Sequence, residues 1–88
     1  MNITDIRVRI LKKDDNKLKA VASIIIDDAF VVHDIKIIDG GEGCFIVMPS
    51  RKTPDGAYRD IAHPIRNDVR EELKDKVLAA YKEALAEN

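Results

Sequence analysis

The sequence predicts an α+β fold in which a single antiparallel sheet of four to five strands is followed by one C-terminal helix. Three observations carry the prediction. Apolar and polar residues alternate through the first half of the chain, turn-forming residues separate these stretches, and apolar residues recur at helical spacing near the C-terminus. The 88 residues suffice for one domain, expected to span residues 1–88, because no repeat or low-complexity segment divides them.

The first two strands are expected to form a hairpin. Arg7 and Arg9 alternate with three apolar residues, and the alternation resumes over residues 18–26. Residues 13–16 are Lys-Asp-Asp-Asn, which favours a turn between the two strands.

Two further strands are expected before the middle of the chain. Asp27-Asp28 ends the second strand, and a third is predicted from Phe30 to Ile38. Gly40-Gly41 then forms a turn, and Cys44 to Met48 forms a short strand that is apolar on both faces. A strand without a polar side has to be covered by other parts of the protein on both of its faces.

Residues 49–57 are unusual because they contain two prolines and a glycine, which argue against regular structure. Within them, Pro54-Asp55-Gly56 predicts a tight turn. Tyr58 to Ala62 is expected as a last short strand, ended by Pro64.

The final helix is expected to begin at Asn67 or Asp68, either of which is a favourable capping residue. One apolar stripe is suited to packing on the sheet and consists of Val69, Leu73, Val77, Ala80 and Ala84. A second stripe, a third of a turn away, is expected to be spare and to contact a dimer mate or partner through Leu78, Tyr81 and Leu85. The alternative is that it rests on a loop of its own domain.

Composition restricts the class of protein. A chain of 88 residues buries a modest core, and its one cysteine, Cys44, excludes an internal disulfide as support. Self-association, most simply a homodimer, is therefore expected. The cytoplasm is the expected compartment, with no membrane association, because there is no long apolar run and Met1-Asn2-Ile3-Thr4-Asp5 does not resemble a signal peptide.

Charge is unevenly distributed although the net charge is only −1. Residues 1–20 carry +3 and residues 21–48 carry −4, whereas residues 49–70 return to +2 and residues 71–88 carry −2. Four of the five basic residues in the third block are arginines, whose planar fork matches phosphate and base edges. A local cationic face is thus compatible with a near-neutral chain.

Catalytic and metal-binding constellations are not expected. His33 and His63 are the only histidines, neither belongs to a nucleophile motif, and Cys44 lies in an apolar strand with no adjoining base. Asp27 and Asp28 with His33 and Asp34 lack metal-ligand spacing, because neighbouring strand residues point to opposite faces. Gly40–Gly43 lacks the lysine-serine tail of a phosphate loop. We therefore expect no enzyme, metal, cofactor or small-molecule substrate.

The remaining candidate is a basic constellation around the proline-rich segment and the helix start. It consists of Ser50, Arg51, Lys52, Thr53, Arg59, Arg66 and Arg70. Helix N-termini favour phosphate, and the prolines stiffen the loop so that docking costs less entropy. The alternative is a solvated polar loop whose arginines pair with Asp55, Asp60 and Asp68. Residue chemistry alone does not separate these two hypotheses.

The segment from Met48 to Gly56, with its continuation from Tyr58 to Ile65, resembles the signature of the SpoVG family of bacterial stage V sporulation (septation) proteins. The opening residues 3–8 and the segment 35–40 are similar to the same family. After Pro64-Ile65 this chain departs from the family, which commonly has small hydroxylic residues where Arg66-Asn67-Asp68 stand.

The resemblance implies a small dimeric regulator that binds DNA and RNA and influences septation and sporulation. It also implies nucleic-acid contact at the matching residues Ser50, Arg51, Lys52, Thr53, Arg59 and Arg66. The expected function is nucleic-acid-binding regulation. The alternative is a protein-interaction module of the division or sporulation machinery that has no physiological nucleic-acid ligand.

Overall fold

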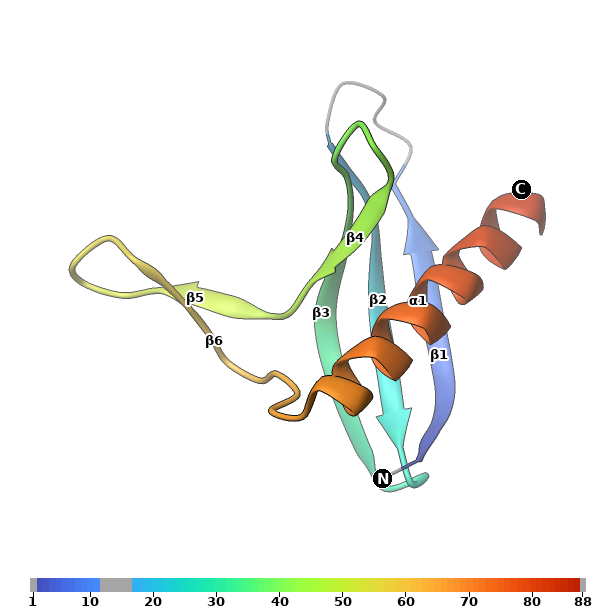
Figure 1. Ribbon diagram of the computed structural model, residues 1–88, viewed down its shortest axis with the longest axis horizontal. Coiled ribbons are helices and arrows are strands. Elements are labelled where there is room, and N and C mark those ends of the chain that lie inside the picture. Colours follow the sequence, from blue (N-terminus) through green and yellow to red (C-terminus); the bar gives the residue numbers. More distant parts are fainter. Residues whose placement is uncertain (1, 12–16, 88) are drawn as a thin grey trace.

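The computed structural model describes residues 2–11 and 17–87, so the turn expected at residues 13–16 lies outside the described residues. A four-stranded antiparallel sheet has the order β1-β2-β3-β4, and a separate two-stranded sheet pairs β5 with β6 (Figure 1). One long helix, α1, follows, which confirms the α+β class. The elements are β1 (Ile3–Ile10), β2 (Leu18–Ile26), β3 (Phe30–Asp39), β4 (Cys44–Val47), β5 (Ser50–Lys52), β6 (Tyr58–Asp60) and α1 (Asn67–Glu87).

The connection between β2 and β3 is a three-residue loop, residues 27–29, across which Ile26 pairs with Phe30. Asp27 and Asp28 have φ of 53° and 54°, and the amide of Ala29 donates to the carbonyl of Ile26 at 2.9 Å. Positive φ at both central residues defines the mirror-image type I turn, whose twist matches that of paired strands. The aspartates expected to end the second strand therefore build the hairpin.

The core lies between one face of the four-stranded sheet and α1. β2 contributes Ala20 and Ala22, at 0% and 1% exposure, and these small side chains let the helix lie close to the sheet. β3 contributes Ile35 and Ile37, both at 0% exposure. In Figure 1 the helix runs diagonally across the sheet, and its backbone lies nearest to β1 and β4.

The two apolar stripes expected on the helix do not separate into one that packs on the sheet and one that is spare. The buried residues of the helix are Leu73, Val77 and Tyr81, so Tyr81 belongs to the core of its own domain. Leu78 also packs partly against this core, and of the expected partner stripe Leu85 alone is well exposed, at 46%. The prediction failed at Tyr81 because the helix crosses the sheet obliquely, so its contacting side changes along its length. Burial raises the pKa of the Tyr81 hydroxyl.

Residues 49–61 form a projection that we call the arm. Regular structure was not expected over residues 49–57, yet β5 lies there and pairs with β6, which falls within the strand predicted from Tyr58 to Ala62. The main sheet does not gain a fifth strand, because the chain leaves β4 at Val47 and passes through Pro49, which has no amide hydrogen to donate. Figure 1 shows the arm extending away from both sheet and helix.

Within the described part of the chain, no helix combines the length and apolar character that a membrane span requires.

Candidate nucleic-acid interface

The arm is a short antiparallel ribbon whose register places two arginines side by side. Arg51 lies directly opposite Arg59, Ser50 opposite Asp60, and Lys52 opposite Tyr58. Directly opposed residues of an antiparallel pair share a face, and successive residues alternate between faces. Arg51 and Arg59 therefore share one face of the ribbon, whereas Ser50, Lys52 and Tyr58 share the other.

The tip of the arm is a proline–glycine turn closed by hydrogen bonds. The amide of Gly56 donates to the carbonyl of Thr53 at 2.9 Å, and the amide of Thr53 donates to the carbonyl of Ala57 at 2.7 Å. Gly56 has φ of 87°, where a side chain is disfavoured, and Pro54 presets the first turn position. The turn predicted from Pro54-Asp55-Gly56 is thus confirmed.

Thr53 and Asp55 are occupied within this turn. The Thr53 hydroxyl contacts the Asp55 carboxylate and lies 3.0 Å from the carbonyl of Ala57. Its bond to Asp55, followed by backbone hydrogen bonds, lowers the pKa of that carboxyl. Thr53 therefore shapes the turn, and Asp55 is held by a hydroxyl instead of by an arginine.

The cations of the arm are exposed and unpaired with acids. Among residues 2–11 and 17–87, the ion pairs are Arg7–Asp5, Arg66–Asp68, Lys74–Glu71 and Lys76–Glu72. Arg51, Lys52 and Arg59 are therefore free of such pairing, although Asp55 and Asp60 lie on the same short ribbon. For these three residues the structure favours an open cationic surface over a self-neutralised loop.

Arg66 and Arg70, in contrast, are engaged at the start of α1. The Arg66 guanidinium forms a two-point ion pair with Asp68, with one Nε–Oδ1 distance of 3.0 Å. This hydrogen bond raises the pKa of Arg66 and lowers the pKa of Asp68. Arg70 donates to the carbonyl of Pro64 at 3.2 Å. The expected constellation is thus divided into an open group on the arm and a locally bonded pair at the helix start.

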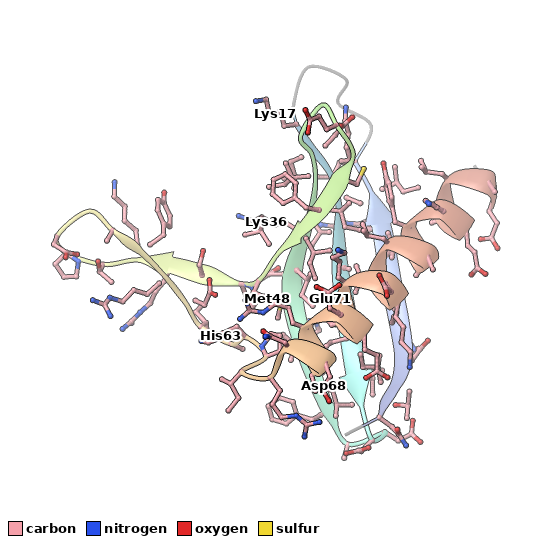
Figure 2. The ribbon with its side chains drawn as sticks, viewed as in Figure 1. Lys17, Lys36, Met48, His63, Asp68 and Glu71 are labelled. Atoms are coloured by element: carbon pink, nitrogen blue, oxygen red, sulfur yellow. The ribbon has the colours of Figure 1, made fainter. Side chains whose placement is uncertain are left out.

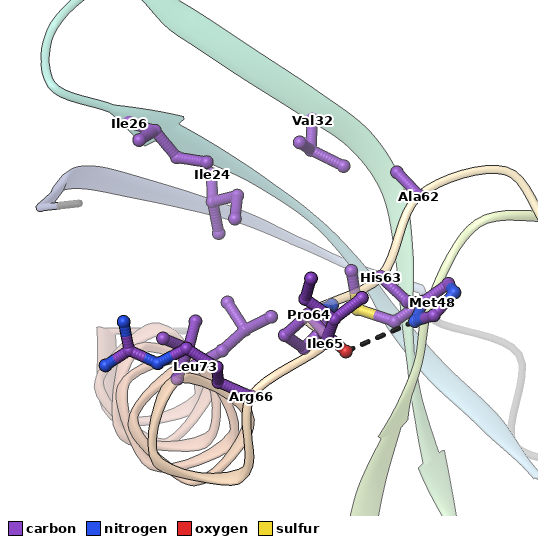
Figure 3. Close-up of a pocket in the computed structure, with 11 residues that line it drawn as sticks. Ile24, Ile26, Val32, Met48, Ala62, His63, Pro64, Ile65, Arg66 and Leu73 are labelled. Carbon is purple, nitrogen blue, oxygen red and sulfur yellow. Dashed lines mark hydrogen bonds between the residues drawn. The ribbon is translucent and has the colours of Figure 1, made fainter.

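Exposed apolar residues, which we did not predict, lie on the arm and just after it. Tyr58, Ile61 and Ile65 are exposed at 71%, 67% and 88%. Beside Ile65 a cavity of about 370 Å³ lies between the sheet, the connector after β6 and the first turns of α1 (Figure 3). Ile24, Met48 and Leu73 belong to its lining. We call Ile65 together with this cavity the apolar side. Ile61 was expected inside the last short strand, and no sequence pattern distinguished Ile65, which follows Pro64.

Each of the two histidines is exposed and lies within hydrogen-bonding distance of one neighbouring group. His63 lies at the root of the arm, near Met48 (Figure 2), and its Nδ1 is 3.2 Å from the carbonyl of Pro64. His33 Nδ1 lies 2.9 Å from the Ser23 hydroxyl on the sheet. In the described ranges, no group of three or more His, Cys, Asp or Glu residues is placed to hold a metal ion. Cys44 is half-buried and packs against the core.

The fold and the arm define a class of protein: a small α+β domain that carries a projecting, basic β-ribbon beside an apolar cavity. The SpoVG family model matches residues 1–83 of the chain. The chain therefore belongs to the SpoVG family.

Curated relatives align over nearly the whole chain. A protein of Lachnospira eligens is 61% identical over 84 residues, covering 96% of this chain and 94% of the relative. One from Heliobacterium modesticaldum is 55% identical, covering 98% and 96%. One from Staphylococcus aureus strain Newman is 49% identical, covering 94% and 82%. Each of the three is named "Putative septation protein SpoVG".

Proposed function

We propose that this chain is a nucleic-acid-binding regulatory protein that acts in septation, and that its arm makes the nucleic-acid contact. The observation that carries the proposal is the direct opposition of Arg51 and Arg59 on an exposed ribbon. Like charges directly opposite each other destabilise a strand pair. An anion bound between the two guanidinium groups removes this repulsion, and arginine forks suit phosphate oxygens and guanine edges.

The shape of the arm supports the same ligand. A two-stranded β-ribbon fits the major groove of duplex DNA, and the prolines and closed turn limit the entropy lost on docking. Pro49 anchors the ribbon, since its carbonyl accepts from the amide of Ile61 at 2.7 Å. Phosphate contacts by three cations per arm supply affinity without sequence information.

A homodimer would double this cationic surface, and the apolar side supports one. Ile65 is 88% exposed at the rim of an apolar cavity whose lining includes Ile24, Met48 and Leu73. A two-fold interface is self-complementary, so an apolar projection and an apolar hollow on one chain can be satisfied by a second copy. We propose that two chains associate through this side.

The test of the nucleic-acid contact is the salt dependence of binding. With six arm cations in a dimer, log affinity for duplex DNA should fall against log salt with a slope of about −5. Arg51→Ala with Lys52→Ala removes four of these cations per dimer and should reduce the slope by about 3 to 4. Fluorescence anisotropy at several salt concentrations measures the slope.

Lys74→Ala with Lys76→Ala is the matched control. It removes the same number of charges from α1, where both lysines are paired with glutamates. The control should keep the slope of the unmodified protein. Equal slopes for all three proteins would contradict the assignment of the arm, and an absence of binding by the unmodified protein would contradict nucleic-acid binding itself.

The dimer is tested by sedimentation of Ile65→Asp, which changes the apolar side and leaves the face of the main sheet opposite α1 unaltered. We expect the variant to be monomeric, whereas Phe30→Asp, an exposed apolar residue at 65% next to the β2–β3 turn, should leave the mass unchanged. If the unmodified protein is already monomeric, the apolar side favours the alternative function, a module that binds a different protein of the division machinery.

A further inference from the structure

The face of the main sheet opposite α1 carries a second group of basic residues. Alternation from the buried Ala20 and Ala22 places Val21 and Ser23 on this opposite face, and Arg7 and Arg9 on β1 lie on it beside them. We call this surface the open face, and its basic side chains are Arg7, Arg9, Lys19, His33 and Lys36. Arg7, Arg9, His33 and Lys36 are exposed, and Figure 2 shows Lys36 directed away from the helix.

The register aligns these residues in two rows across three strands. In one row, Arg7 lies opposite Ser23, whose hydroxyl is 2.9 Å from His33 Nδ1. In the other row, Val21 lies opposite Arg9 on one side and opposite Lys36 on the other. Basic side chains on β1 and β3 thus lie on either side of the neutral residues Val21 and Ser23 on β2. This arrangement is suited to a chain of phosphates.

The balance of charge on the open face favours an anion. Two acids lie among the basic residues, Asp5 and Asp34. Asp5 pairs with Arg7 at 3.2 Å, but both side chains are largely exposed, so the pair is weak and a phosphate can compete for the arginine. Within the described ranges Arg9, Lys19 and Lys36 form no ion pair. A second copy of this chain would bring like charges together and is disfavoured here.

Two hollows connect this surface to the arm. One, of about 480 Å³, is lined by residues that include Arg7, Arg9 and His33. The other, of about 190 Å³, includes Lys36, Ser50 and the exposed Ile61 of the arm. Val21 and Asp34 line both hollows, so the surface continues from β1 to Ser50, the residue that begins β5 and precedes Arg51.

We propose that the open face is a binding track for single-stranded nucleic acid that continues from the arm across Lys36 to Arg7 and Arg9. This inference rests on the proposed function and extends it by one site and one ligand class. A duplex is read by a protruding element such as the arm, whereas single strands lie along charged grooves and exposed four-stranded sheets. Phe45 lies opposite Ile38 on β4, is 45% exposed on this side, and offers a ring on which a base can stack.

The test compares a 20-nucleotide oligothymidine with a 20-base-pair duplex. Arg7→Ala with Arg9→Ala should weaken binding of the single strand about tenfold or more. The same variant should weaken binding of the duplex less than twofold. The salt slope for the single strand should fall by about 1.4 for each protomer that contributes two contacts. Lys74→Ala with Lys76→Ala serves as the control for net charge, and it should change the affinity for either ligand by only a small and equal factor. Circular dichroism confirms that the exposed replacements leave the fold intact.

A length series provides a second readout. Affinity of the unmodified protein should rise between a 10-nucleotide and a 20-nucleotide strand, because the longer strand reaches the open face, and the Arg7/Arg9 variant should lose this gain. The track is refuted if this variant behaves like the lysine control, or if its sedimenting mass changes, which would make the face a contact between copies.

If Arg51→Ala with Lys52→Ala weakens binding while the Arg7/Arg9 variant does not, the arm alone binds and the proposed function stands. An unmodified protein that binds neither ligand contradicts the proposed function and the track together.

Discussion

The body of the molecule, formed by the main sheet and α1, differs from the arm in how each is held together. The body buries whole side chains, with Ile35, Ile37 and Val77 at 0% exposure. Every residue of β6 is exposed, and β5 has no buried residue. The arm is therefore defined by its turn, its register and its anchoring at Pro49, whereas the body is defined by packing.

This contrast separates stability from binding. Burial of an aliphatic side chain stabilises a fold by about 1.5–3 kcal/mol, whereas exposed side chains on a ribbon contribute little. Arginines on such a ribbon remain available to a ligand without cost to the core. The arm thus presents Arg51, Lys52 and Arg59 on strands that contain no buried residue.

The largest expected effect is a loss of stability when the core of the body is altered. Ile35→Ala removes a fully buried side chain from β3 and should lower the free energy of unfolding by about 3 kcal/mol, which corresponds to a fall in Tm of roughly 15 °C. Tyr58→Ala on the arm should change the free energy of unfolding by less than about 0.5 kcal/mol, because Tyr58 is 71% exposed. Urea denaturation followed by circular dichroism measures both. Equal losses in the two variants would show that the arm is part of the cooperative core.

The same contrast separates the elements that were predicted from the sequence from those that were not. Alternation and helical spacing depend on burial against one surface, so the four strands and the helix of the body were predicted. The turn at Pro54-Asp55-Gly56 was predicted because it depends on local backbone preferences. β6 falls within the strand predicted from Tyr58 to Ala62, but its pairing with β5 was missed, because the three polar residues of β5 carry no apolar pattern to detect.

The candidate site was predicted in part for a related reason. Residue chemistry identified Arg51, Lys52 and Arg59 but did not distinguish open cations from paired ones, since pairing depends on side-chain geometry. Arg66 next to Asp68 proved to be paired, and Tyr81 proved to be buried by the oblique course of the helix. The exposed Ile65 and its neighbouring cavity arise from the meeting of sheet, connector and helix, which no local pattern encodes.

A smaller effect is expected at the tip of the arm. Gly56 has φ of 87° with open space around it, so Gly56→Ala introduces backbone strain of about 1 kcal/mol without a clash. This strain should raise the hydrogen-exchange rate of the Thr53 amide about fivefold and leave the exchange of Ile35 unchanged. Gly41→Ala, at φ of 92° and also unobstructed, is the matched control in the β3–β4 turn, and it should leave the Thr53 amide unaffected. Faster exchange in both segments would mean that arm and body open together.

The smallest effect concerns the Asp55 carboxyl, whose pKa is lowered chiefly by the Thr53 hydroxyl. Because the folded pKa lies below the unfolded one, this contact supports the turn above about pH 4 and is lost as the pH falls through the folded value. Thr53→Val removes the donor and should return the pKa of Asp55 toward its ordinary value, whereas Thr53→Ser keeps the hydroxyl and should preserve the lowered pKa. Carboxyl chemical shifts in an NMR titration measure all three proteins. An unchanged pKa in Thr53→Val would mean that the backbone amides alone hold the carboxylate, and the arm would then owe its turn to Pro54 and Gly56 instead of to this side-chain pair.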